Sequence, residues 1–249
     1  MGRAAVCVHG ASHHERRPRL FVGKRGSGPG PGGVSVARGR FLTLEGGEGG
    51  GKTTQRARLV AALRQRGLEV VETREPGGAP GAEAVRRLLV EGTPDRWDAR
   101  TEALLHAAAR RDHLVRTVWP ALERGAWVVS DRFADSTRAY QGAGHGLPLA
   151  DLEALHAFVC GGFQPDLTLI LDLPVAEGLA RARGRAGAEQ RYEQFDRDFH
   201  ERVRQGFLDL AREAGGRCRV IDARADVESV HHRLLALVLA AFPDADVAL

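Results

Sequence analysis

From Arg40 onwards, short apolar runs alternate with longer stretches in which apolar residues recur at helical spacing. The short runs are nearly continuous and four or five residues long, which is typical of strands buried on both faces of a sheet. They occupy residues 41–45, 69–73, 127–130, 167–171 and 219–222. The longer stretches predict helices over residues 54–66, 82–90, 97–124, 149–159, 175–183, 192–213 and 227–241, and Pro120 falls inside the longest of them. This alternation predicts an α/β fold, here a five-stranded parallel sheet covered by helices on both faces.

Most of the candidate functional side chains follow directly after the predicted strands. A glycine-rich loop follows the first strand, Arg74 follows the second, Asp131-Arg132 the third and Asp172 the fourth. Parallel sheets bind their ligands in the crevice outside the carboxyl ends of the strands. We therefore expect these four segments to converge on one site.

The loop after the first strand has the sequence Gly46-Gly47-Glu48-Gly49-Gly50-Gly51-Lys52-Thr53. It matches G-x-x-x-x-G-K-[ST], a motif that binds nucleotide phosphates when it lies between a strand and a helix, as it does here. Glycine-rich backbone can wrap its N–H groups around a polyphosphate, and the positive end of the following helix points at the same anion. The predicted nucleotide-binding residues are Gly46, Gly47, Glu48, Gly49, Gly50, Gly51, Lys52, Thr53 and Thr54.

Lys52 is unusual in a chain that otherwise uses arginine. Lys24 and Lys52 are the only lysines among the 36 Lys and Arg residues. An ammonium is a slim point charge that can reach the β- and γ-phosphates, where a broad guanidinium would be crowded. Thr53 supplies a hydroxyl for Mg²⁺. The motif therefore predicts a nucleotide site that also takes Mg²⁺.

The N-terminal segment differs in composition from the rest of the chain. Residues 1–40 contain eight Lys and Arg and one acidic residue, whereas the remainder contains 28 basic and 31 acidic residues. The formal net charge of +4 therefore comes from this segment and gives no indication that the main body binds nucleic acid. Residues 1–38 show no helical or strand period and include a Gly/Pro run. We expect residues 1–38 to be a disordered extension and residues 39–249 to form one domain.

The extension has two interpretations. Its arginines and scarcity of acidic residues are similar to a mitochondrial transit peptide. We favour an extended start, with Val34 or Val36 as an alternative first residue. Cys7, Cys160 and Cys218 form no C-x-x-C pair, which fits a reducing cytosol, and no apolar run approaches the length of a membrane span. We therefore expect a cytoplasmic protein without membrane or nucleic-acid partners, with a mitochondrial location as the alternative.

Four segments of the chain, in their order, resemble the bacterial thymidylate kinase family. They are Thr43–Gln55, Thr73–Gly78, Asp131–Gly142 and Pro165–Thr168. The resemblance extends from about Arg40 to near the C-terminus, and this combination is much more specific than the phosphate loop alone. It implies a P-loop nucleoside-monophosphate kinase fold and the phosphorylation of dTMP to dTDP by ATP with Mg²⁺. It also implies a homodimer, which we expect to form through the apolar faces of the long helices.

The resemblance implies roles for individual residues. Glu48 corresponds to the acidic residue that accepts a hydrogen bond from the sugar 3′-hydroxyl of the acceptor, and Arg74 and Arg132 correspond to arginines that hold its 5′-phosphate. Tyr140 corresponds to the ring that packs under the deoxyribose and leaves no room for a 2′-hydroxyl. Asp131 corresponds to the acidic partner of the metal and phosphate loop. The implied contacts with thymine are Arg110, His106, Thr137 and Gln141.

His106 departs from the family, which usually has a phenylalanine that stacks on thymine at this position. An imidazole can still stack, but it offers less area and carries a titratable charge. We expect His106 to lie at the base site. Its contribution to base binding stays open, because a surface histidine would explain this position equally well.

The phosphate loop contains no arginine, so a cation for the transferring phosphoryl group has to come from elsewhere. In such members of the family, arginines of a mobile lid supply it. The corresponding region here is residues 181–193, with Gly184 and Gly187 as hinges. Because negative charge spreads over the oxygens of the phosphoryl group, cations in the closed state provide much of the catalysis. The candidate catalytic residues are Lys52, Arg132, Arg181, Arg183, Arg185 and Arg191.

Three other functions share parts of this pattern. A kinase of the same fold could act on another small acceptor, although the combination of Glu48, Arg74 and Tyr140 argues against it. A GTPase-like switch would need an N-K-x-D motif, and no lysine follows Lys52 to form one. A nucleotide-binding module without activity would need neither an intact Lys52-Thr53 pair nor an arginine-rich lid.

Overall fold

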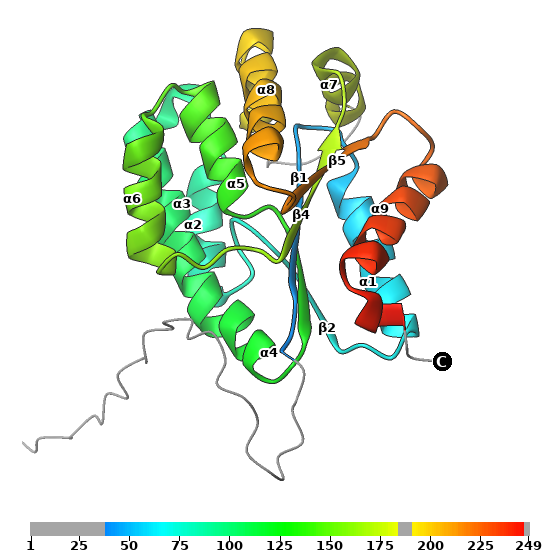
Figure 1. Ribbon diagram of the computed structural model, residues 1–249. Helices are drawn as coiled ribbons and strands as arrows, with labels where there is room; N and C mark the ends of the chain where they lie inside the picture. The colour runs from blue at the N-terminus through cyan, green and yellow to red at the C-terminus, as the bar shows by residue number, and fades with distance from the viewer. Residues whose placement is uncertain (1–37, 184–190, 247–249) are drawn as a thin grey trace, which may run out of the picture.

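The computed structural model describes residues 38–183 and 191–246 (Figure 1). At its centre is a sheet of five parallel strands in the order β2-β3-β1-β4-β5. The strands are β1 (Phe41–Glu45), β2 (Val70–Arg74), β3 (Trp127–Asp131), β4 (Leu167–Asp172) and β5 (Cys218–Asp222). This sheet confirms the predicted architecture, and each strand lies within one residue of its expected bounds. The predicted N-terminal extension lies outside the described residues, except for Arg38.

Helices cover both faces of the sheet. On one face, α1 (Lys52–Gln65) and α9 (Val227–Ala241) lie side by side (Figure 1). The opposite face carries a larger helical layer. Its main members are α2 (Pro80–Val90), α3 (Ala99–His113), α6 (Leu149–Cys160) and α8 (Arg197–Glu213).

Strand β1 shows why the short apolar runs suit this arrangement. Successive side chains of a strand point to opposite faces of the sheet. Leu42 and Leu44 pack in the core formed with α1 and α9, which includes Leu63. Phe41 instead packs in the core of the larger layer, where its ring meets Phe133 edge-on at 5.0 Å between centroids. A strand that is apolar on both sides is thus buried by both layers.

The predicted long helix over residues 97–124 is continuous but changes its winding. Asp98 begins it by accepting hydrogen bonds from the backbone N–H groups of Arg100 and Thr101, at 2.9 and 3.1 Å. The helix α3 then leads into a π-helical turn, η2 (Leu114–Val118), and into α4 (Trp119–Glu123). Pro120 lies in the first turn of α4, where its missing N–H is tolerated. The change in winding is therefore a π turn that precedes Pro120.

The prediction of one helix over residues 192–213 is wrong. The segment contains a single 3₁₀ turn, η4 (Tyr192–Gln194), followed by a separate helix, α8. Asp196 separates the two, because its side chain accepts a hydrogen bond from the Phe199 N–H at 2.7 Å and so begins α8.

A helical segment that the apolar pattern did not reveal carries part of the site. It consists of α5 (Ala134–Thr137) and a π-helical turn, η3 (Arg138–Gly144), and it packs closely on α8. A Cβ atom added at Gly144 would lie 2.6 Å from the Phe199 ring, so the close approach requires glycine at this position. The small residues that permit this contact also interrupt the regular spacing of apolar residues. Because that spacing is the sequence signal of a helix, this segment was not predicted as one.

Three short elements complete the described structure. They are η1 (Pro94–Arg96), α7 (Val175–Arg183) and η5 (Pro243–Asp246). Cys160 and Cys218 are buried free thiols. Within the described part of the chain, no helix combines the length and the apolar character needed to cross a membrane.

Candidate active site

The loop between β1 and α1 has the backbone conformation needed to enclose an anion. Gly46, Gly49 and Gly51 have φ angles of 128°, 72° and 84°, a region that favours glycine. A Cβ atom at Gly49 would lie 2.0 Å from the carbonyl oxygen of Gly178 in α7, so this position excludes a side chain. Because Gly51 directly precedes α1, the N–H groups of the first helical turn face the same space.

Lys52 extends from the start of α1 back over the loop. Its Nζ donates hydrogen bonds to the carbonyl oxygens of Gly46 at 3.1 Å and Gly47 at 2.7 Å. Burial, with a further contribution from Arg132, lowers the pKa of Lys52 from 10.5 to about 8. The ammonium is therefore mostly charged near neutral pH.

Thr53 and Asp131 form an oxygen-rich corner beside Lys52. The Thr53 hydroxyl donates a hydrogen bond to Oδ2 of Asp131 at 3.0 Å, and Arg56 lies 3.8 Å from the same oxygen. Among the described residues there is no group of three or more His, Cys, Asp or Glu side chains that could hold a metal on its own. One hydroxyl and one carboxylate fit Mg²⁺, which usually takes one or two protein oxygens and completes its shell with phosphates and water.

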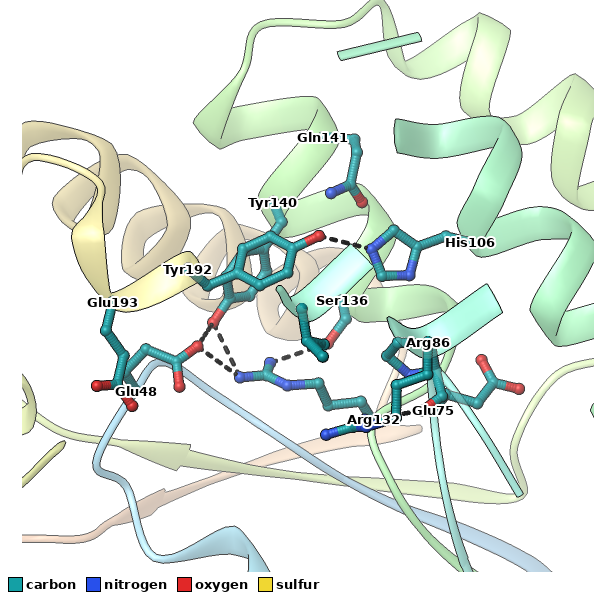
Figure 2. Close-up of a pocket in the computed structure, with 12 residues that line it drawn as sticks. Glu48, Glu75, Arg86, His106, Arg132, Ser136, Tyr140, Gln141, Tyr192 and Glu193 are labelled. Carbon is teal, nitrogen blue, oxygen red and sulfur yellow. Dashed lines mark hydrogen bonds and ion pairs between the residues drawn. The ribbon is translucent and has the colours of Figure 1, made fainter. Parts of the chain in front are cut away.

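Arg132 connects the phosphate loop to η3. Its guanidinium donates hydrogen bonds to the carbonyl oxygen of Gly46 at 3.0 Å and to the hydroxyl of Ser136 at 3.1 Å. It also donates to Oε1 of Glu48 at 3.0 Å and to the Tyr140 hydroxyl at 2.9 Å. Tyr140 in turn donates its hydroxyl to the same Glu48 oxygen at 2.7 Å. Figure 2 shows Glu48, Arg132 and Tyr140 meeting at one wall of a pocket.

The pair of Glu48 and Arg132 is ionised although it is largely withdrawn from water. Both side chains are 17% exposed. Burial raises the pKa of Glu48, but the nearby charges of Arg132 and Lys52 outweigh this effect and lower it to about 2. Burial also disfavours the charged form of Arg132, but Tyr140 and Glu48 raise its pKa overall. A carboxylate is therefore stable beside a phosphate-binding loop because a guanidinium accompanies it.

The direction of the Arg132 side chain depends on an unusual backbone conformation. Arg132 has a φ angle of 72°, and no other non-glycine residue in the described ranges has a positive φ. Glu45, at the end of β1, holds the turn by accepting hydrogen bonds from the Phe133 N–H at 2.8 Å and the Ser136 hydroxyl at 2.5 Å. Burial and the neighbouring Asp135 raise the pKa of Glu45 to about 7. The hydrogen bonds to Glu45 thus help to offset the energetic cost of the Arg132 backbone conformation.

Two cavities adjoin this cluster. The first has a volume of about 590 Å³ and is the pocket shown in Figure 2. It is lined by Glu48, Glu75, Pro76, Arg86, Val90, His106, Arg132, Ser136, Tyr140, Gln141, Tyr192 and Glu193. The second, of about 840 Å³, contains the loop from Glu48 to Thr53 together with Asp131. Glu48 and Arg132 line both cavities, so they form part of the boundary between them.

The residues implied for base recognition divide into two groups. His106 and Gln141 line the first cavity. Arg110 and Thr137 are buried, at 5% and 7% exposed, and do not line it. Arg110 donates to Oε2 of Glu75 at 2.8 Å and to the Thr137 hydroxyl at 3.0 Å. The two are thus positioned at the pocket through Glu75, which is part of its lining.

His106 is neither a surface residue nor a simple replacement for phenylalanine. Its Nε2 lies 2.9 Å from the hydroxyl of Tyr192, and Figure 2 shows this contact above the pocket. Burial lowers the pKa of His106 to about 4, so the imidazole is neutral at physiological pH. Tyr192 also packs edge-on against Tyr140, with the ring centroids 5.6 Å apart. The neutral histidine therefore holds the tyrosine that covers the pocket.

Arg74 does not reach the first cavity. It lies on the outer side of the second cavity, is 45% exposed, and pairs with Glu83 at 3.1 Å. Arg86, on α2, instead lines both cavities and donates to the carbonyl oxygen of Pro76 at 2.8 Å. Figure 2 shows Arg86 on the same side of the pocket as Arg132.

Arg191, predicted as a lid arginine with a catalytic role, lies in the interior of the structure. Its side chain is fully buried and pairs with Glu102 at 2.5 Å, so it belongs to the core and not to a mobile surface. Arg181 and Arg183 are exposed on α7, and Arg181 donates to the carbonyl oxygen of Ala223 at 3.1 Å. Arg185 and the proposed hinges lie outside the described residues.

Several residues of the site have no predicted role. Glu75 lies in the Thr73–Gly78 segment. The motif in this segment indicated that the segment lies near the site, but it did not indicate what the Glu75 carboxylate does there. Arg86 lies on an ordinary amphipathic helix, and no local pattern distinguishes it from its neighbours. Tyr192 directly follows Arg191, so its position near the site was indicated, but its contact with His106 was not.

The fold and the site together define a P-loop kinase of the α/β class. Comparison with known proteins identifies the family, since the thymidylate kinase family model matches residues 44–234. The chain belongs to the thymidylate kinase family, whose members phosphorylate dTMP to dTDP with ATP. It is accordingly an ATP-dependent phosphotransferase.

Individual relatives agree with this assignment. The thymidylate kinase of Caulobacter vibrioides is 55% identical over 195 residues, which cover 78% of this chain and 93% of the relative. That of Ruegeria pomeroyi is 53% identical over 201 residues, which cover 81% of this chain and 95% of the relative. The crystal structure of thymidylate kinase from Ehrlichia chaffeensis matches with a TM-score of 0.65 and 34% identity, and the match covers 81% of this chain and 99% of that chain.

The lowered pKa of Lys52 predicts a pH dependence. The charged form is the protonated one, so the cation is lost as the pH rises through about 8. We expect kcat/KM for ATP to fall above this pH, because this ratio reports ionisations of the free enzyme. A Lys52→Arg variant should be less active overall but should lack the alkaline fall, since arginine stays protonated. If the pH profile of the variant keeps the same alkaline limb, another group is responsible.

Proposed function

We propose that the first cavity holds dTMP and the second holds the triphosphate of ATP with Mg²⁺. The observation that carries this proposal is the pair of Glu48 and Arg132, which lines both cavities. A donor in the phosphate loop and an acceptor in the pocket would meet at this pair. An enzyme that transfers a phosphoryl group achieves most of its catalysis by positioning the two anionic reactants and stabilising their charge.

On the donor side, the loop from Gly46 to Gly51 wraps the phosphates and Lys52 neutralises them. Thr53 and Asp131 would hold Mg²⁺, which would withdraw negative charge from the phosphates. Thr54, in the first turn of α1, contributes its backbone N–H to the same end of the helix. These roles follow from the loop geometry, the Lys52 hydrogen bonds and the 3.0 Å contact between Thr53 and Asp131.

On the acceptor side, Arg132 and Arg86 hold the 5′-phosphate and Glu48 accepts a hydrogen bond from the 3′-hydroxyl. Tyr140 lies under the deoxyribose, where its fixed ring excludes a 2′-hydroxyl. The acceptor phosphate is already anionic at neutral pH, so no side chain has to remove a proton from it. The task of the site is to align this oxygen with the γ-phosphorus and to offset the repulsion between the two anions.

At the far end of the pocket, His106 and Gln141 contact the base. Arg110 stays our candidate for the outer edge of the base, because it bonds Glu75 in the pocket wall and can follow that residue when a nucleotide enters. Thr137 orients Arg110 through the hydrogen bond of 3.0 Å between them. The Tyr192 ring closes the pocket from above.

A coupled ADP-release assay over dTMP, dUMP, dCMP, dGMP and UMP tests the function. We expect the highest kcat/KM for dTMP and a much lower value for UMP than for dUMP, because UMP carries the 2′-hydroxyl. Faster turnover of dCMP or dGMP would indicate a kinase for another acceptor. ATP binding without turnover of any of the five would indicate a nucleotide-binding module.

The positions of Arg86 and Arg74 predict different effects on dTMP binding. Arg86→Ala should raise the KM for dTMP by roughly tenfold or more, because a charge-assisted hydrogen bond contributes about 1.5–3 kcal/mol. Arg74→Ala removes the same group from a half-exposed pair with Glu83, and should raise the KM by less than about threefold. Steady-state kinetics of both variants would show the reverse order if Arg74 is the phosphate ligand.

Arginines at the end of α7 complete the site in our proposal. Gly178 of α7 contacts Gly49, so the helix begins next to the phosphate loop and carries Arg181 and Arg183 along its side. We expect neutralisation of at least one of these two, or of Arg185, to lower kcat by roughly 10²-fold with little change in the KM for dTMP. Arg224→Ala is a suitable control, because Arg224 is exposed and pairs with Asp222 nearby. Near-normal kcat in all three variants would assign the cation to Arg132.

We further propose a homodimer formed through α3 and α6. These adjacent helices carry large apolar side chains in water, with Leu104 59% exposed and Phe158 89% exposed. Exposed apolar side chains on packed helices are typical of an interface, and a two-fold dimer would cover the same face of both copies. Sedimentation velocity should show a dimer for the native chain and a monomer for Phe158→Asp.

A further inference from the structure

Glu102 lies at the centre of a buried polar cluster behind the nucleotide pocket. Its side chain is fully buried in α3, one helical turn before His106. Oε2 accepts a hydrogen bond from Arg191 at 2.5 Å, and Oε1 accepts one from the Gln141 amide nitrogen at 2.7 Å. His145 lies 3.5 Å from Oε1. Neither the phosphate loop nor the proposed chemistry uses this carboxylate, so its position requires another explanation.

The carboxylate cannot change its position or its charge easily. Arg191 is anchored by its guanidinium, which also donates to three backbone carbonyl oxygens, those of Leu89, Thr93 and Pro94, at 3.3, 2.9 and 2.8 Å. Burial raises the pKa of Glu102, but the neighbouring His145 and Arg191 contribute to lowering it to about 2. Glu102 is therefore ionised, and an ionised carboxylate only accepts hydrogen bonds.

This charge state fixes the orientation of the Gln141 amide. The two ends of a glutamine amide are nearly alike in shape, and its orientation follows from the hydrogen bonds that its neighbours can make. A partner that only accepts requires the NH₂ end, so the carbonyl end of Gln141 has to face elsewhere. Gln141 lines the pocket, and Figure 2 shows its amide directed towards the pocket interior.

We infer that Glu102 is a positioning residue for base selection, acting by holding Gln141 so that the pocket presents an acceptor to the base. This inference rests on the proposed function. Thymine and uracil carry a hydrogen-bond donor at N3, whereas cytosine carries an acceptor there. An oxygen facing N3 therefore binds the first two bases and opposes cytosine. Arg191 contributes to this arrangement by holding Glu102 in place.

The test is the Glu102→Gln variant, assayed with dTMP and dCMP. A neutral amide at position 102 can either donate or accept, so Gln141 is free to turn its NH₂ end towards the base. We expect kcat/KM for dTMP to fall and that for dCMP to rise, so that their ratio decreases at least tenfold. A site built to hydrogen-bond one partner loses selectivity on this scale when that arrangement is removed.

Two matched variants separate selection from a merely structural role. Glu102→Asp keeps an acceptor-only group and should keep most of the ratio, even if thermal unfolding shows lower stability. His106→Phe changes the next turn of the same helix face, and should affect both nucleotides alike because it leaves Glu102 and Gln141 in place. A decrease in the ratio that is equally large in His106→Phe would contradict the inference.

Glu102→Gln leaves Arg191 buried without a carboxylate, and this variant could fail to fold. The double variant Glu102→Gln, Arg191→Met removes both charges and retains a side chain of similar length, and it should show the same loss of selectivity. An unchanged ratio in either folded variant overturns the role of Glu102. The proposed function fails separately, if the native chain itself does not phosphorylate dTMP.

Discussion

The ion pair between Arg132 and Glu48 is the interaction on which the rest of the site depends. Glu48 belongs to the loop after β1 and Arg132 to the turn after β3, and the parallel register of these strands brings Leu44 opposite Asp131. Because the pair is mostly withdrawn from water, loss of either partner would leave the other charge without compensation, at a cost of several kcal/mol. The pair therefore fixes the spacing between the phosphate loop and the first cavity.

The strained turn at Arg132 is supported by the same strand that carries the phosphate loop. Glu45 ends β1 and accepts hydrogen bonds from both the backbone and the side chain of the turn after Arg132. Strand β1 thus positions the phosphate loop directly and the turn at Arg132 through the Glu45 carboxylate. The central strand of the sheet therefore helps to hold both cavities in a fixed relation to each other.

The arginines of this chain differ in function through the carboxylates that they meet. Arginine stays protonated under all ordinary conditions, so each buried arginine needs an anion or several carbonyl oxygens around it. Arg191 pairs with Glu102 and is part of the core. Arg110 pairs with Glu75, and Arg132 pairs with Glu48. Chemically identical side chains therefore occupy three different environments, which are the core, contact with the wall of the first cavity and the boundary between the two cavities.

The sequence by itself determined the features that depend on neighbouring residues. Apolar runs located the five strands, and the spacing of glycines, Lys52 and Thr53 identified the phosphate loop, because both signals are contained within a few consecutive residues. Only the tertiary structure decided which distant groups meet. His106 bonds Tyr192 across 86 positions, Arg191 meets Glu102 across 89, and Arg86 rather than Arg74 lines the first cavity. These contacts depend on how the helices pack against one another, which the sequence pattern does not predict. The surroundings of each arginine in the folded structure, and not its spacing in the sequence, therefore decide which groups it contacts.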